Sequence, residues 1–225
     1  MKDHYAILRK VGWVFIVVGL IDFGLMIYSI VNKASYNSSF NIFAVIAGIF
    51  LLKGNLKATR LISLFIAIFI GTSIGNIVFM PFLSPIDLLL TSFRLEPINH
   101  IISFVSFLTY MAISVWGYCE LTSEPVRTAM DESGVNYISF FKKPIIGFGI
   151  GGCLTLYMVI LMSSIMNGAT ATEVKQRAAV QVGKGYKFHI DSINWSSSSS
   201  NKHVYSIVTA YNDAQIKNIV VEWSE

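Results

Sequence analysis

Apolar runs that are nearly free of charge alternate with short polar segments through most of the chain, and a polar tail follows them. The apolar runs cover residues 11–31, 38–52, 61–83, 101–119 and 145–166. Four of these runs hold about 20 residues, the length at which a helix spans a hydrocarbon core about 30 Å thick. The pattern therefore predicts a membrane all-α bundle of five transmembrane helices within residues 1–166.

The second run is the weakest of the five, because it holds only fifteen residues even when Ser38 and Ser39 are included. To cross the membrane it has to thin the bilayer, stand upright or use Lys53 as a snorkelling end. A re-entrant segment is the alternative. That alternative would place Lys53, Lys57 and Arg60 on the same side of the membrane as the preceding loop.

Basic residues concentrate in every second polar segment. Three lie in each odd-numbered segment and one in each even-numbered loop: Lys2, Arg9 and Lys10; Lys33; Lys53, Lys57 and Arg60; Arg94; and Arg127, Lys142 and Lys143. Loops rich in Lys and Arg stay on the cytoplasmic side of a membrane. The alternation predicts five crossings of a bacterial inner membrane, with the N-terminus inside and the C-terminus in the periplasm or outside the cell.

The polar tail, residues 167–225, has the pattern of a small α+β domain. Helix-forming residues cover 172–182, and Gly183 is placed as a helix C-cap. Strand-like alternation follows at 186–195, 204–211 and 216–223. The phase of the first strand slips near Asp191 and Ser192, which indicates a bulge. We expect a helix followed by a three-stranded antiparallel meander.

A tail of fewer than sixty residues has a thin core, and it contains neither cysteine of the chain. Its stability therefore calls for support from the membrane surface, from the outer loops, from a second copy or from a membrane-protein partner. The last strand is a candidate open edge for pairing with another chain, and its candidate binding residues are Ile219, Val221 and Trp223.

Two loops carry short helix signals. Glu124 and Pro125 suit a helix start, Val126 and Met130 share one face, and Gly134 is placed to end the helix. Residues 84–90, Ser-Pro-Ile-Asp-Leu-Leu-Leu, predict a second short helix on the outer membrane surface.

Composition supports membrane insertion and argues against nucleic-acid binding. Hydrophobic residues make up 54% of the chain and charged residues 13%, against roughly 25% charged in soluble proteins. The mean hydropathy is +0.60. The net charge of +4 is dispersed along the sequence, whereas a nucleic-acid surface needs Lys and Arg on one face.

Asp22 lies midway along the first apolar run, where a carboxylate costs about 3 kcal/mol. We expect it to face the other helices and to be protonated or hydrogen-bonded. When the runs are aligned by their midpoints, hydroxyl and amide side chains fall close to its depth. This candidate polar layer comprises Asp22, Thr72, Ser73, Asn76, Thr109, Tyr110, Thr155 and Tyr157.

The layer has two interpretations. It is either a site for a proton, an ion or a ligand, or a hydrogen-bond anchor worth about 0.6 to 2 kcal/mol between helices. The anchor is favoured, because a transport pathway usually needs several ionisable groups and Asp22 is alone among the apolar runs.

Catalytic and cofactor motifs are lacking. The four histidines are not at metal-ligand spacing, and zinc-protease, nucleophile-elbow and Walker motifs are absent from the sequence. Residues 147–152 match G-x-G-x-x-G, but they open an apolar run instead of following a strand, so they predict close helix packing. The G-x-x-x-G pair at Gly71 and Gly75 has the same interpretation. We expect no enzyme activity, no metal and no cofactor.

Taken together, these features favour an accessory, assembly or immunity-type membrane component that binds another protein through its exported tail. The alternative is a small proton or solute transporter or channel that uses the Asp22 layer.

Overall fold

The computed structural model describes residues 3–31, 41–135, 142–183, 185–197 and 202–224. The protein is mostly helical and ends in a three-stranded antiparallel sheet. Contacts divide the chain into two compact units. The first unit is Met1–Ile74 with Val105–Gly152, and the second is Gly75–Phe104 with Cys153–Glu225.

Among the described residues, four helices are long and apolar enough to cross a membrane, as a membrane-embedded protein requires. They are α1 (Asp3–Val31), α3 (Leu56–Leu83), α5 (Pro97–Leu121) and α7 (Lys142–Met166). The predicted second crossing contains a shorter helix, α2 (Asn41–Leu52), which is about 18 Å long against a hydrocarbon core of about 30 Å. Residues 38–40 of that run lie outside the described residues, and the fifth crossing stays a prediction.

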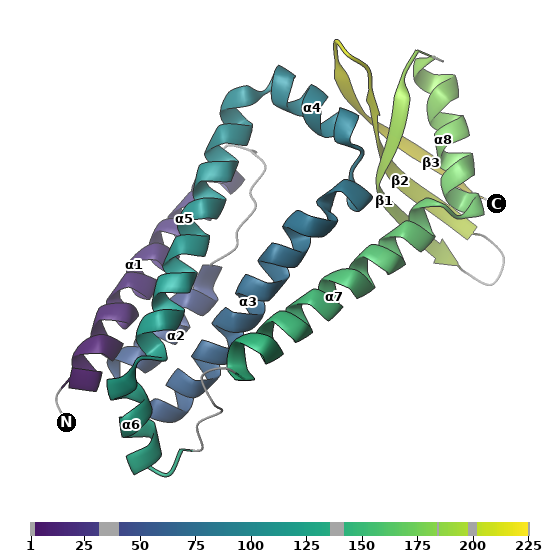
Figure 1. Cartoon of the computed structure of the whole chain (residues 1–225). Coiled ribbons are helices and arrows are strands. Elements are labelled where there is room, and N and C mark those ends of the chain that lie inside the picture. The colour runs from purple at the N-terminus through teal and green to yellow at the C-terminus, as the bar shows by residue number, and fades with distance from the viewer. Residues whose placement is uncertain (1–2, 32–40, 136–141, 184, 198–201, 225) are drawn as a thin grey trace. The chain divides into compact units, whose positions relative to one another are not determined.

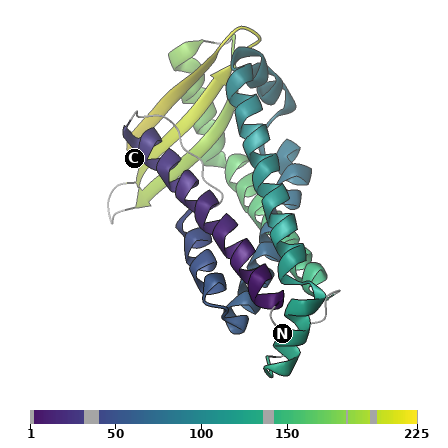
Figure 2. The ribbon, with the colours of Figure 1, turned by 90° about the vertical axis from the view of Figure 1, so that its left-hand side faces the viewer.

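In the first unit, α1 and α2 pack along each other (Figures 1 and 2). Glycines lie at their contact. A Cβ atom built on Gly48 would lie 2.6 Å from the carbonyl oxygen of Gly12, so only glycine lets the two backbones approach this closely. The core of this unit draws buried residues from α1, α2, α3, α5 and one further short helix.

That short helix is α6 (Glu124–Glu132), and it confirms the prediction for its loop. Ser123 is the N-cap residue, with a proline in the first turn. Val126 and Met130 are both fully buried in the core of the first unit. Gly134 follows the helix with a φ of 70°, a left-handed conformation that glycine adopts without strain.

The second unit contains the short helix α4 (Ile86–Leu95), the helix α8 (Ala169–Val182) and the sheet. The strands are β1 (Lys187–Ser197), β2 (Lys202–Tyr211) and β3 (Ile216–Ser224), with β2 in the centre and both pairings antiparallel. Helix α8 lies across one face of the sheet (Figure 1). The buried core between them is Ala171, Val174, Ala178, Ile190, Val204, Val208, Ala210, Ile219, Val221 and Trp223.

Several local predictions for the tail are confirmed. The β1–β2 register shifts between Ile190 and Ser192, where the bulge was expected. Gly183 caps α8 with a φ of 93°. The β2–β3 turn is closed by Asn212, whose Oδ1 accepts hydrogen bonds from the amides of Ala214 and Gln215. The predicted domain boundary after residue 166 stays a prediction.

Candidate functional site

Asp22 is enclosed within the first unit, where only 2% of it is exposed. The hydroxyl of Tyr110 on α5 donates a hydrogen bond to Asp22 Oδ1 at 3.1 Å. This bond joins α1 to α5 across 88 positions of sequence. A carboxylate oxygen that accepts a phenolic hydrogen bond can hold two apolar helices together.

The other members of the predicted polar layer have different surroundings. The hydroxyls of Thr72 and Thr109 donate to carbonyls of their own helices, those of Ile68 and Val105. Ser73 is buried in the first unit. In the second unit, Thr155 is buried whereas Asn76 and Tyr157 are exposed. The structure therefore brings Tyr110 to Asp22, and a functional role for the layer stays a prediction.

The glycine-rich runs in α3 and α7, each predicted to pack closely against another helix, pack against each other. A Cβ atom on Gly71 would lie 2.8 Å from the carbonyl oxygen of Gly147, and one on Gly151 would lie 2.5 Å from the amide nitrogen of Thr72. Farther along, a Cβ atom on Gly75 would lie 2.8 Å from the hydroxyl of Thr155. Within residues 147–152, Gly147 and Gly151 thus form the contact with α3, whereas a Cβ atom on Gly149 or Gly152 would meet no atom within 4 Å.

The sheet has a second face, opposite α8. Side chains on this face alternate with the core positions along each strand, so Ile207 on β2 and its cross-strand partner Val220 on β3 both belong to it. Val220 is 50% exposed, and Ile207 and the neighbouring Tyr205 are partly exposed. We call this surface, centred on Tyr205, Ile207 and Val220, the open sheet face.

Polar side chains surround the open sheet face. The hydroxyl of Thr209 lies 2.6 Å from Asp191 Oδ2 and 3.1 Å from Asn218 Oδ1. On the other side, His203 Nε2 lies 3.2 Å from Glu222 Oε1. These groups can hydrogen-bond to the polar atoms of a bound molecule.

Helix α4 is joined to the sheet through Asp87. The buried Tyr211 of β2 donates its hydroxyl to Asp87 Oδ1 at 3.0 Å, and Lys187 of β1 forms an ion pair with Asp87 Oδ2. The partners are separated by 124 and 100 positions of sequence. This three-residue junction, Asp87 with Lys187 and Tyr211, was not found from the sequence, because nothing in the local pattern shows which strand end meets α4.

The junction shifts all three pKa values. Hydrogen bonding from Lys187 lowers the pKa of Asp87 below 3.8, and the same contact raises the pKa of Lys187 above 10.5. Burial is the main cause that raises the pKa of Tyr211 from 10.0 to about 12, and its bond to Asp87 adds to the shift. The junction is thus held with Asp87 ionised, Lys187 charged and Tyr211 neutral.

We expect α4 to stay on the sheet between pH 3.8 and pH 10.0 and to loosen as the pH moves beyond these limits. A lowered carboxyl pKa stabilises the junction above the ordinary value of 3.8, and this contribution is lost as pH falls through the lowered pKa. The raised Tyr211 pKa stabilises it below pH 10.0, and this contribution is lost between pH 10.0 and about 12. A spin-label distance between α4 and β3 measures the change.

Asp87→Asn should remove the acid-side change in that distance, because the amide does not titrate. Glu173→Gln, which breaks the exposed ion pair with Arg177 on α8, should leave it unchanged. An acid transition that persists in Asp87→Asn would contradict the role of Asp87.

The predicted partner-binding residues belong to an edge strand, since β3 pairs with β2 alone among the described strands. Their side chains, however, face α8: Ile219, Val221 and Trp223 all lie in the core. Arg177 of α8 stacks on the Trp223 ring at 4.5 Å. A partner at this edge would therefore meet the β3 backbone and the side chains of the open sheet face.

Two histidines lie far apart on the sheet, since His189 is paired with Thr209 and His203 with Ser196. Burial lowers the pKa of His189, and the charge of Asp191 opposes the shift. Within the described residues, no three or more His, Cys, Asp or Glu side chains gather in a way that could hold a metal ion.

The candidate sites are thus the Asp22–Tyr110 pair in the first unit and the open sheet face with its polar rim in the second. No protein-family model, no curated protein and no solved structure matches this chain, so its function is argued from the geometry of its own residues.

Proposed function

We propose that the protein is an accessory, assembly or immunity-type component of a membrane complex, and that its C-terminal domain binds another protein. The observation that carries this proposal is the arrangement of the sheet. Helix α8 covers one face, while the opposite face exposes an apolar centre with Val220 half in solvent.

The open sheet face has the make-up of a protein-binding surface. Its centre combines the aromatic ring of Tyr205 with the cross-strand pair Ile207 and Val220. Its rim carries hydrogen-bonding groups, among them Asp191 and Glu222. An apolar centre that excludes water and a polar rim that adds hydrogen bonds are the usual anatomy of specific interfaces.

A partner would also stabilise the domain. The sheet and α8 together hold few buried side chains, and small domains of this kind are marginal without support. The Asp87 junction supplies support at one end of the sheet, through Tyr211 and Lys187. A protein bound to the open sheet face would bury the apolar surface that remains.

The proposal places the C-terminal domain outside the cytoplasm. The four long apolar helices and the short α2 would make five crossings of a bacterial inner membrane, with the N-terminus on the cytoplasmic side. The alternation of basic residues supports this topology.

Purification of the N-terminally tagged full chain in mild detergent tests the proposal. Wild-type protein should bring down one different protein in stoichiometric amount. Val220→Asp should reduce that yield at least about tenfold, because it places a charge at the apolar centre of the open sheet face. Val180→Asp is the matched control, since Val180 is a valine of α8 that is 87% exposed, and it should keep the partner.

A wild-type protein that elutes as a lone monomer would overturn the proposal. So would equal partner yield from wild type and Val220→Asp. A complex whose mass equals two copies of this chain would assign the open sheet face to self-association instead.

A small proton or solute transporter is the second candidate function. The observation that favours it is the burial of Asp22 against the hydroxyl of Tyr110 in the first unit. Intramembrane carboxylates often carry protons or bind ions. The same hydrogen bond also suits an anchor, which is the role that we favour.

As an anchor, Asp22 should be replaceable by Asn, whose amide oxygen can still accept the Tyr110 hydrogen bond. We expect Asp22→Asn to keep normal expression and partner yield, and Asp22→Leu to lower stability by about 1 to 2 kcal/mol. Thermal unfolding in detergent and partner yield are the readouts. Proton flux is also measured in liposomes that contain either the wild-type protein or Asp22→Asn. If the wild type conducts protons and Asp22→Asn, expressed at a normal level, does not, Asp22 serves a transporter and not an anchor.

A further inference from the structure

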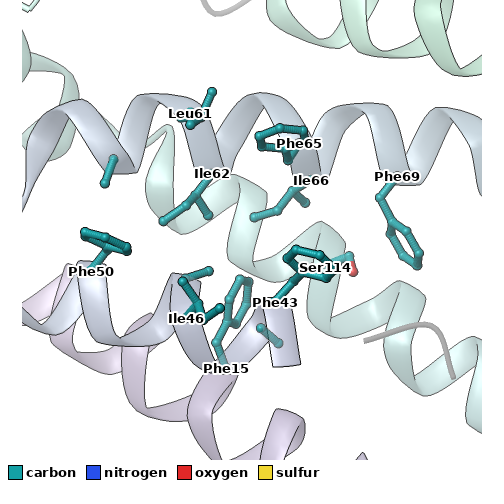
Figure 3. Close-up of a pocket in the computed structure, with 13 residues that line it drawn as sticks. Phe15, Phe43, Ile46, Phe50, Leu61, Ile62, Phe65, Ile66, Phe69 and Ser114 are labelled. Atoms are coloured by element: carbon teal, nitrogen blue, oxygen red, sulfur yellow. The ribbon is translucent and has the colours of Figure 1, made fainter. Parts of the chain in front are cut away.

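The first unit contains an apolar cavity of about 630 Å³ (Figure 3). Its lining comes from α1, α2, α3 and α5, and it includes five phenylalanines. Phe43 of α2 and Phe65 of α3 are among the most exposed of these rings. A volume of this size accommodates a typical small ligand.

Ser114 of α5 is the one side chain with a polar atom among the described residues that line the cavity. It is 1% exposed, and its hydroxyl makes no hydrogen bond to the part of the chain that the structure describes. This is unusual within this protein. The hydroxyls of Thr109 and Thr122, on or just after the same helix, donate to backbone carbonyls one turn earlier, as helical hydroxyls commonly do.

An unpaired buried hydroxyl costs about 1 to 3 kcal/mol. A bound molecule with one hydrogen-bonding oxygen would remove that cost. Because no charged side chain of the described residues lines the cavity, a charged group placed there would lose its hydration without gaining a counter-ion. The chemistry of the cavity therefore selects a neutral ligand with a long apolar body and one hydroxyl group.

The position of Ser114 adds to this argument. Tyr110 and Ser114 are four residues apart, so they lie on the same face of α5, about 6 Å apart along its axis. Phe15, which lines the cavity, and Asp22 are seven residues apart and share a face of α1. The Asp22–Tyr110 hydrogen bond thus lies about one turn of α5 from Ser114.

We propose that this cavity binds a neutral membrane lipid that carries a single hydroxyl group, and that this hydroxyl hydrogen-bonds to Ser114 Oγ. The four contributing helices include three of the apolar spans, so the ligand reaches the cavity from the bilayer. The phenylalanine and isoleucine side chains hold its apolar body. This site is independent of the open sheet face, since all of its lining residues belong to the first unit.

Photolabelling with two matched probes tests the proposal. The full-length protein in phosphatidylcholine nanodiscs is exposed either to a diazirine-bearing hexadecanol or to the corresponding hexadecane, which lacks the hydroxyl. We expect about fivefold more labelling of cavity peptides by the alcohol, the preference that one net hydrogen bond supplies.

Ser114→Ala should reduce that preference to about one without harming the fold, because it removes a hydroxyl that has no hydrogen-bond partner in the described chain. Ala58→Trp should reduce labelling by both probes, because Ala58 lines the cavity. Leu108→Trp, at an exposed position of α5 that does not line the cavity, should leave the labelling unchanged.

Equal labelling of the wild type by both probes would overturn the proposal and show an unspecific lipid groove. A preference for the alcohol that survives Ser114→Ala would overturn it as well, as would labels that map outside the cavity. If Ala58→Trp fails to fold, Ser114→Ala still decides the outcome.

Discussion

Gly151→Leu should separate α7 from α3 and lower the stability of the protein by about 3 kcal/mol or more. A Cβ atom at this position would lie 2.5 Å from the amide nitrogen of Thr72 and 2.8 Å from the carbonyl carbon of Gly71. Both are backbone atoms, so a rotamer change cannot relieve the clash. Thermal unfolding of the detergent-solubilised protein, followed by its elution profile, measures the loss.

Gly149→Leu is the matched control, because a Cβ atom at Gly149 would meet nothing within 4 Å. Both substitutions add the same side chain to the same helix, and they share the same gain in helix propensity. The contact face is refuted if the two variants have the same unfolding temperature.

Val221→Asp should unfold the C-terminal domain. Val221 is 1% exposed in the core under α8, and a carboxylate placed there without a partner costs on the order of 3 to 5 kcal/mol. A domain with so small a core cannot absorb that loss. Limited proteolysis of the full chain should show rapid cleavage within the last three strands, while the helices remain intact.

The neighbouring Val220→Asp should leave the domain folded, at a cost of about 1 kcal/mol or less, because this side chain points to the open sheet face. Its expected effect is loss of the partner alone. Rapid proteolysis of both variants would contradict the structure, in which Val221 is buried under α8 and Val220 lies on the open sheet face.

Elements with a local signal could be predicted from the sequence. After residue 166, helix-forming residues predicted the helix of the tail, and alternating polar and apolar residues predicted its three strands. The phase slip near Asp191 predicted the bulge. Glu124 and Pro125 indicated the start of α6, and Gly134 indicated its end. In each case the residues that determine the structure are neighbours along the chain.

Contacts between distant segments could not be predicted in this way. Midpoint alignment placed Asp22 and Tyr110 at similar depth, but it could not show that they share a hydrogen bond. The alternation of the last strand predicted that its side chains lie on two faces of the sheet. It could not show that α8 covers the face that contains Trp223. The Asp87 junction and the unpaired hydroxyl of Ser114 depend wholly on tertiary packing.

The glycine runs illustrate both cases. Their position inside apolar helices was enough to identify Gly147 and Gly151 as packing residues. It was not enough to separate them from Gly149 and Gly152, which meet no atom within 4 Å of an added Cβ. That difference depends on which side of α7 meets α3.

Determining the side of the membrane on which the C-terminal domain lies is the most direct test of the proposed function. Both native cysteines, Cys119 and Cys153, are free thiols, and replacing them with serine gives a background for single cysteines. Asp213→Cys then reports on which side of the membrane the β2–β3 turn lies, and Asp131→Cys reports the same for α6. In spheroplasts, a membrane-impermeant maleimide should label the first and spare the second until the cells are lysed. An Asp213→Cys thiol that reacts only after lysis would place the domain in the cytoplasm and contradict the five-crossing topology.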